Sequence, residues 1–564
     1  MNYPSWEVPI IGSGWVIGGI AIIHVLISHF AVGGGLYLPM AERKMLRQGL
    51  TEWGPVLRGH SKFFLILTGV FGASTGVAIW FAIGLASPEA TSTLIHNFVF
   101  GWAMEWVFFL LELTTAAVYY YTWGRIDDKL HVFVGWVYAG MSLATLVIIN
   151  GILTFMLTPG SAWLEVAGTG QEASRFWQAF FNPTYWPSLG LRTLICITLA
   201  GVWALVTASR IDGFENPRLK ASVIQWSAKW LVPAYLLIPV FFWWYLEMVP
   251  DAQQALLQLG MATIGQGVFT QVTRAALVTC MSSATIGAIV YFLAYRNPRD
   301  FTFGHACAVL FLALAATAST EQAREMLRKP YVVVNHMYSN GIRVKKDVDR
   351  FNQEGYLAST IWARQEERDA WARMDAQPPA ETPVVGQAAP AANIETPGLK
   401  AQEAIDHAAK LARGELMMRG QCMACHTVDG YRSLRRLLAG RDRESVGSIL
   451  TMLHEYKEDS HYRKFMPPLV GTPQEVEALG DYLAEKVVLP PPADGNVAVA
   501  SASGPGSSAA PAPAAAPGAE TPASTPVAPA APATVPASAP AEPTAAPAPV
   551  PAEPAPTPAP APAP

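Results

Sequence analysis

The sequence has little charge and few cysteines. Only 15% of its 564 residues are Asp, Glu, Lys or Arg, while hydrophobic residues make up 51%; ordinary soluble domains carry about 25% charged residues. The five cysteines are too scattered for a disulfide framework. A formal net charge of −4 gives no support for nucleic-acid binding. This composition excludes a purely soluble enzyme and favours a membrane protein with a soluble part attached.

Long apolar runs recur along the first part of the chain. A helix needs about 20 apolar residues to cross a bilayer, and eight runs meet this requirement, near residues 13–40, 62–86, 97–123, 132–157, 188–208, 229–249, 267–295 and 301–320. The N-terminus lacks the basic start of a cleavable signal peptide, so the first run is expected to remain as an anchor. Residues 1–330 are therefore predicted to form an all-α, polytopic membrane bundle.

Lys and Arg alternate between the connections of these runs. The first, third, fifth and seventh connections are rich in them, whereas the second and sixth have none and the fourth has only Arg175. Because cytoplasmic loops carry the excess of Lys and Arg, we expect the N-terminus to face outward and the chain to emerge outside again after the eighth run. The predicted location is a bacterial cytoplasmic (inner) membrane, with the rest of the chain on its periplasmic side.

The remaining chain divides by composition. Residues 331–376 are expected to form an external amphipathic segment and 377–399 a Pro/Ala-rich linker about which the following domain could swing. Residues 400–488 are predicted to form a small helical domain. The tail, 489–564, is nearly all Ala, Pro, Ser and Thr and is expected to be disordered.

The strongest motif is Cys422-Met423-Ala424-Cys425-His426, the C-x-x-C-H attachment sequence of a c-type haem. Two thiols at this spacing reach both vinyl groups of one porphyrin, and the adjacent His then binds the iron. Met466, which precedes two prolines and a predicted helix, resembles the sixth ligand of class I cytochromes c, in which a thioether raises the iron potential. Other residues compete for the sixth position: Met417, Met418, His454 and His461.

Ionisable residues within the apolar runs are functional candidates, because burying charge in a bilayer is costly. Most are expected in the outer half of the membrane: His24, His29, Glu105, Glu112, Arg192, Arg274 and Glu321. His could bind iron, the carboxylates could carry protons, and Arg192 and Arg274 could neutralise haem propionates. The alternative is that the His residues only bridge helices by hydrogen bonds and that the charges form ion pairs.

The run from His24 to Arg43 resembles the first span of subunit I of cytochrome bd-type quinol oxidases, in which a His precedes a Met-Glu pair at this separation. Phe71–Gly76 and Phe100–Glu112 resemble the second and third spans of that family. This resemblance implies that His24 binds one haem of a high-spin pair (haem b or haem d) and that Glu105 and Glu112 act as ligand or proton-delivery groups. Glu321 would replace the family's haem-ligating Glu of the eighth span, and a second membrane subunit is expected.

The chain also departs from that family. The positions that hold the His and Met ligands of the low-spin haem read Leu191-Arg192 and Arg274-Ala275-Ala276 here, and the external quinol loop shrinks to about residues 250–266. We therefore expect an oxidoreductase that takes electrons from a periplasmic cytochrome c or similar donor, through haem c, and reduces O₂ or a similar small acceptor. The alternative is a non-catalytic electron conduit or membrane anchor that serves another respiratory complex.

Overall fold

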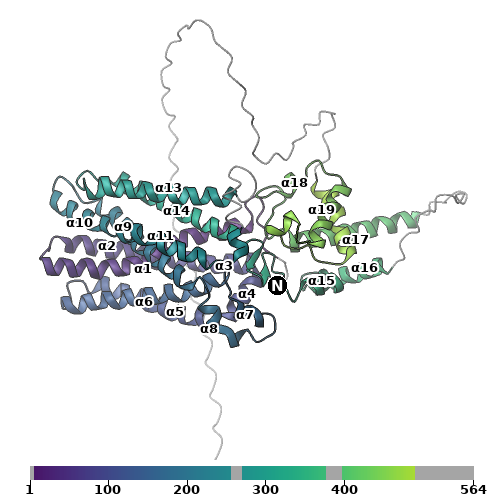
Figure 1. The fold of residues 1–564 in the computed structure, drawn as a ribbon, viewed down its shortest axis with the longest axis horizontal. Helices are drawn as coiled ribbons and strands as arrows, with labels where there is room; N and C mark the ends of the chain where they lie inside the picture. Colours follow the sequence, from purple (N-terminus) through teal and green to yellow (C-terminus); the bar gives the residue numbers. More distant parts are fainter. Residues whose placement is uncertain (1–4, 256–269, 377–396, 489–564) are drawn as a thin grey trace, which may run out of the picture. The chain divides into compact units, whose positions relative to one another are not determined.

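The computed structural model describes residues 5–255, 270–376 and 397–488, and this part of the chain is almost entirely helical (Figure 1). Within these described residues, eight helical segments are long and apolar enough to cross a membrane: Ser13–Gln48, Trp53–Ala86, Val99–Tyr121, Asp128–Phe155, Tyr185–Ala208, Pro217–Glu247, Gln271–Tyr295 and Phe303–Arg328. The predicted all-α fold with eight spans is confirmed, and the chain is an integral membrane protein.

The helices extend beyond the apolar runs that predicted them. α1 (Ser13–Gln48) continues to Gln48 rather than ending near residue 40, and α14 (Phe303–Arg328) continues through Glu321 and Glu325. Hydropathy detects the part of a helix that meets lipid, whereas the backbone hydrogen bonds that hold the helix continue into its polar ends. The intramembrane charges predicted near the span ends therefore lie on regular helix.

Several spans are built from more than one element. The second consists of α2 (Trp53–Ile66), the π-helix η1 (Leu67–Gly72) and α3 (Ala73–Ala86). The sixth combines α10 (Pro217–Lys229) with α11 (Val232–Glu247), and the seventh combines α13 (Thr270–Ile289) with η3 (Val290–Tyr295). The other spans are α5 (Val99–Tyr121), α6 (Asp128–Phe155) and α9 (Tyr185–Ala208).

α1 packs against α6, α9 and α3. A Cβ atom at Gly33 would lie 1.8 Å from the carbonyl oxygen of Cys196, and one at Gly34 would lie 2.2 Å from the Phe64 ring. Small residues at such contacts let membrane helices approach closely, because packing rather than hydrophobicity holds helices together in lipid. The Gly33-Gly34-Gly35 run thus allows α1 to contact several neighbours at once.

Short helices connect the spans. α4 (Pro88–Asn97) lies between the second and third spans, and α7 (Ser161–Val166), η2 (Glu172–Arg175) and α8 (Phe176–Phe180) lie between the fourth and fifth. Apolar side chains from these connections pack with α6 and with Val333 and Met337 of the segment after α14. The fourth connection is therefore a packed layer on the bundle.

The C-terminal part contains a small hairpin that the sequence did not predict, β1 (Tyr331–Val333) and β2 (Met337–Tyr338), which pair antiparallel. The helices that follow are α15 (Val348–Glu354), η4 (Leu357–Ser359), α16 (Gln365–Asp375), α17 (Pro397–Gln421), α18 (Leu434–Leu437), α19 (Arg443–Glu455), η5 (His461–Lys464), α20 (Pro473–Tyr482) and η6 (Leu483–Val487).

The segment 331–376 and the predicted domain 400–488 share one hydrophobic core. Tyr356 and Trp371 from the first are buried together with Met417 and Leu479 from the second. The indole Nε1 of Trp371 donates to the carbonyl of Ala409 at 3.2 Å. The sequence analysis treated the two segments as separate because the Pro/Ala-rich stretch 377–399 is typical of a domain boundary. In the structure, residues from both sides of that stretch contribute to the core.

The helices on either side of that stretch, α16 and α17, pack on each other. Arg413 of α17 donates to both carboxylate oxygens of Asp375, at 2.9 and 3.1 Å. These contacts join the two helices, and the predicted swing about 377–399 stays a prediction. Most of this predicted linker (377–396) and the whole predicted tail (489–564) lie outside the described residues.

Candidate functional site

The C-x-x-C-H motif forms the turn that follows α17. Cys422 and Cys425 are both unpaired thiols, and burial raises the pKa of the Cys422 thiol to about 12, so that it is uncharged at neutral pH. The Nδ1 atom of His426 lies 2.8 Å from the carbonyl oxygen of Arg432. A carbonyl only accepts, so Nδ1 carries the proton and the lone pair is on Nε2. His426 is thus in the tautomer that a metal ligand needs.

Met466 lies on a loop that several contacts hold in place. The Tyr456 hydroxyl donates to the Met466 carbonyl at 3.0 Å, and the Met466 amide donates to the Tyr462 carbonyl at 2.9 Å. The Gln421 carboxamide donates to the Val470 carbonyl at 2.6 Å and accepts from the Val470 amide at 2.9 Å. Gln421 directly precedes Cys422, so this pair ties the Met466 loop to the C-x-x-C-H turn.

The competing ligands differ in their surroundings. Met417 and Met418 are buried in the core of the C-terminal part. The Nδ1 atom of His454 lies 3.0 Å from the Leu469 carbonyl, which leaves its Nε2 lone pair free as in His426, so His454 stays an alternative sixth ligand. The side chain of His461 lies outside the described residues. The two thiols, His426 and Met466 are all partly exposed. Cys422 and Met466 pack against the same core, which is compatible with a covalent haem.

His24 of α1 is in the same tautomer as His426, with the proton on Nδ1. Its Nδ1 lies 3.0 Å from the Thr75 hydroxyl, and that hydroxyl donates its proton to the carbonyls of Phe71 and Gly72. The oxygen of Thr75 can therefore only accept from His24, which leaves the Nε2 lone pair free. His24 is half-buried, so it retains the capacity to bind iron that the sequence predicted.

Glu105 and Glu112 lie on one face of α5. Glu112 is only 6% exposed, whereas Glu105 is half-buried, and a separation of seven residues places them about 10.5 Å apart along the helix. The two carboxyl groups interact electrostatically. The role of these two carboxyl groups as haem ligands or proton carriers stays a prediction.

The structure brings Arg192, Glu321 and His29 together from α9, α14 and α1, within electrostatic reach of one another. Glu321 also forms an ion pair with Arg324 at 2.8 Å, which engages the carboxylate proposed as a haem ligand. Arg192 has a buried Nε atom without a hydrogen-bond partner in the described part of the chain.

Arg274 does not join this group. It is exposed on α13 and is not among the groups that interact with Arg192 or Glu321. The proposal that Arg192 and Arg274 neutralise haem propionates stays a prediction. Helical position gave the depth of Arg274 in the membrane but not the direction of its side chain.

The sequence analysis missed a buried cluster at the end of the bundle where α5 ends and α6 begins. Glu42 of α1, only 3% exposed, accepts from the Tyr119 hydroxyl at 2.7 Å and pairs with Nδ1 of His131 at 2.6 Å. Glu42 and His131 lie near polar connections between spans, where charged residues normally face water. No sequence signal therefore marked these two residues as buried. We refer to Glu42, His131 and Tyr119 as the triad.

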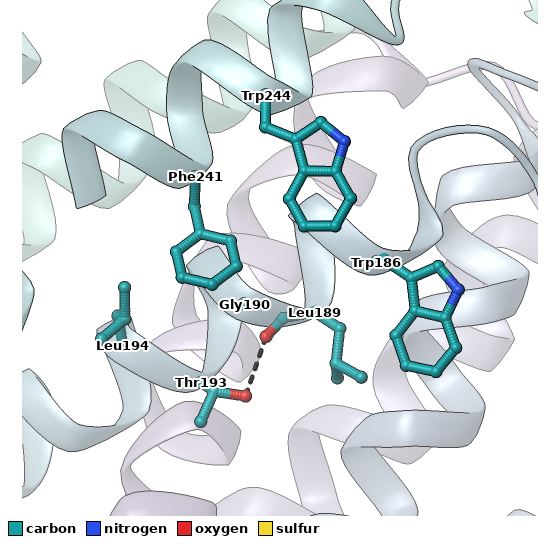
Figure 2. Close-up of a pocket in the computed structure, with 7 residues that line it drawn as sticks. All are labelled: Trp186, Leu189, Gly190, Thr193, Leu194, Phe241 and Trp244. Carbon is teal, nitrogen blue, oxygen red and sulfur yellow. Dashed lines mark hydrogen bonds between the residues drawn. The ribbon is translucent and has the colours of Figure 1, made fainter. Parts of the chain in front are cut away.

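An apolar groove of about 380 Å³ lies between α9 and α11 (Figure 2). Its lining consists of Trp186, Leu189, Gly190, Thr193, Leu194, Phe241 and Trp244, and the Thr193 hydroxyl donates to the Leu189 carbonyl. None of these side chains is a strong iron ligand. The groove lies between the fifth and sixth spans and does not include Arg274 of the seventh.

The loop after His426 touches the start of α1 and the end of α14. The Tyr431 amide donates to the Ile10 carbonyl at 2.6 Å, and the Arg432 guanidinium contacts the Met326 sulfur at 3.6 Å. Arg419 pairs with Glu7 at 3.2 Å. The carbonyl that orients His426 thus belongs to a residue whose side chain touches the bundle.

These features define a multi-span α-helical membrane protein with a C-x-x-C-H sequence in a separate helical part. Residues 13–241 match the family model described as "Cytochrome bd terminal oxidase subunit I". This match supports the family that the resemblance of the first three spans predicted, and it covers the first five spans and most of the sixth.

Two further proteins are similar to this chain. "Cytochrome bd-II ubiquinol oxidase subunit 1" of Escherichia coli (strain K12) is 27% identical over 173 residues, which cover 30% of this chain and 33% of the relative. The match thus spans about a third of that relative's length. The structure titled "The structure of bd oxidase from Geobacillus thermodenitrificans" aligns with a TM-score of 0.49 and 16% identity, over 57% of this chain and 87% of that one.

Proposed function

We propose that this chain is a subunit of a haem-containing membrane oxidoreductase that receives electrons from a periplasmic donor and reduces O₂ or a similar small acceptor. The observation that carries the proposal is the orientation of His426 by the Arg432 carbonyl, beside two unpaired thiols at the haem-attachment spacing. The match of residues 13–241 to a terminal oxidase subunit supports an oxidase, which works with a second membrane subunit.

Each site residue has a defined role in this proposal. Cys422 and Cys425 would attach the haem through thioether bonds, and His426 and Met466 would bind its iron. His24 would hold iron in the bundle through Nε2. Haem in these places supplies a one-electron couple whose potential the axial ligands adjust. Glu112 and Glu105 carry the protons that oxygen reduction consumes, one for each electron.

The contact of the Tyr431–Arg432 loop with Ile10 and Met326 supports electron transfer from the attached haem directly into the bundle. A fixed contact keeps the two cofactor sites at a constant separation, which a domain swinging on a linker would not. The donor then binds elsewhere on the C-terminal part.

The test is a haem count on the purified full chain, by pyridine haemochrome spectra together with CO difference spectra. We expect one covalent haem and additional CO-reactive haem. His24→Ala should abolish the CO-reactive signal and keep the covalent haem, whereas Cys422→Ser with Cys425→Ser should do the reverse. His96→Ala, an exposed histidine of α4, is the matched control.

Two results contradict the assignment. If His24→Ala leaves the CO-reactive signal intact, His24 is not the ligand. If the purified protein carries covalent haem alone and consumes no oxygen with a reduced donor, it is an electron conduit or anchor rather than an oxidase.

A further inference from the structure

The triad joins three helices through hydrogen bonds that fix a proton count. Nε2 of His131 lies 2.8 Å from the Tyr119 carbonyl, and a carbonyl can only accept, so Nε2 is protonated. Nδ1 of the same ring faces Glu42 Oε1 at 2.6 Å. This contact needs one proton between the two atoms, whether it belongs to the imidazolium or to the carboxyl group. The triad therefore stores one proton more than a neutral His beside a carboxylate.

The second oxygen of Glu42 accepts from the Tyr119 hydroxyl, so both carboxylate oxygens are occupied. All three side chains are at most 3% exposed. The other charged group that acts on His131 is Asp128, one turn earlier on α6.

Titratable groups continue from the triad along both helices. On α5, Tyr119 is seven residues from Glu112, and Glu112 is seven from Glu105, which gives steps of about 10.5 Å along one face. On the antiparallel α6, His131 is seven residues from Tyr138, which interacts electrostatically with Glu112. Tyr138 of α6 therefore faces Glu112 of α5, and His131 of α6 lies beside Tyr119 of α5.

A pocket of about 460 Å³, lined by both charged and apolar side chains, lies on the other side of the triad. Its lining includes Arg58, Gly59, Lys62, Tyr120 and Trp123. The Trp123 ring contacts the His131 ring at 4.8 Å and the Tyr119 ring at 5.5 Å between centroids. Trp123 is therefore the wall between the pocket and the triad, and the pocket provides water access at the end that Lys and Arg predict to be cytoplasmic.

We propose that Glu42, His131 and Tyr119 form a proton-loading site, filled through the Arg58–Lys62 pocket, that supplies Glu112. This inference rests on the proposed function, since oxygen reduction consumes the protons delivered. The proton moves from water in the pocket to the His131–Glu42 pair and then along the face of α5. No electron changes place in this step.

The first test measures the protonation of the triad in the absence of turnover. Infrared difference spectra of the full-length holoprotein are recorded as the pH is changed. We expect carboxyl and imidazole bands that titrate in the wild type and are lost in both Glu42→Gln and His131→Gln. If these variants leave the titrating bands unchanged, the pair does not exchange its proton and the proposal is wrong.

The second test reads delivery during oxygen consumption. Glu42→Gln should lower turnover about tenfold or more, the range for loss of a proton-transfer group, with unchanged haem spectra. Gly59→Phe fills the pocket without altering the triad, because open space surrounds a Cβ at Gly59, and it should also lower turnover. Gly140→Phe, on α6 with equally open space, is the control and should keep wild-type turnover.

The outcomes separate the two proposals. If the wild type consumes no oxygen, the proposed function fails, and the infrared titration alone decides whether the triad exchanges a proton. If oxygen consumption is normal in Glu42→Gln and Gly59→Phe while only the melting temperature changes, the triad is a structural clamp and the inference is overturned.

Discussion

Gly414 of α17 lies against the backbone of α20 at Ala478: a Cβ atom at Gly414 would be 2.1 Å from the Ala478 carbonyl oxygen. The same atom would be 2.6 Å from the Cβ of Tyr482. Because backbone cannot move aside as a flexible side chain can, only glycine fits where these two helices cross.

Gly414→Ala should separate the two helices and destabilise the C-terminal part by about 3 kcal/mol, the upper range for overpacking. Thermal unfolding of this part, followed by circular dichroism, measures the loss. Gly447→Ala in α19 is the matched control, since a Cβ there meets only the end of the Arg443 side chain. Equal melting temperatures for both variants would show that the crossing tolerates a methyl group.

Glu475 is a buried carboxylate, 2% exposed, that accepts from the amides of Tyr356 and Leu357 at 2.8 Å each and of Thr472 at 2.9 Å. Glu475→Gln replaces an acceptor with a donor that faces these amides, at a cost of about 2 kcal/mol. We expect faster hydrogen exchange at Tyr356 and Leu357. The exposed Glu477→Gln should leave their exchange rates unchanged, and equal rates in both variants would contradict the role of Glu475.

Gln421 holds the Met466 loop through its two hydrogen bonds with Val470. Gln421→Glu places a carboxylate oxygen against the Val470 carbonyl and should release the loop. If Met466 binds iron, the variant loses the absorption band of thioether ligation and its reduction potential falls, because Met ligation raises that potential. An unchanged potential would mean that the loop does not depend on Gln421 or that Met466 is not the ligand.

His336, between β1 and β2, is 8% exposed, and burial with nearby Arg343 lowers its pKa to about 4 from the usual 6.5. The unfolded chain therefore binds more protons between these two pH values, and stability falls as the pH decreases from 6.5 toward 4. The loss approaches about 3 kcal/mol. His336→Phe should remove this dependence, so that the difference in melting temperature between wild type and variant grows on acidification. A constant difference would contradict the prediction.

The sequence predicted the bundle because a span needs little more than a long apolar run. It also predicted the positions of His24, Cys422, Cys425 and His426, since the motif and the depth in the membrane depend on local spacing. The described structure agrees with the tautomers that His24 and His426 would need. Their binding of haem stays a prediction.

The triad and the hydrogen bonds from backbone amides to Glu475 could not be predicted in this way. Glu42 meets His131 across 89 positions of sequence, and Glu475 meets Tyr356 across 119. Each looks like an ordinary surface carboxylate until helices from distant parts of the chain enclose it. For Arg274 the sequence indicated the depth along its span. It did not indicate the rotation of the helix, which decides the direction of the side chain.

The pairing of α16 with α17, through Trp371 to Ala409 and Arg413 to Asp375, has a practical consequence. Non-covalent contacts hold α16 and α17 together in addition to the peptide chain that connects them. A protease site inserted between residues 377 and 396 should yield two fragments that purify together, so that isotopes or fluorophores can be introduced into one half of the protein alone.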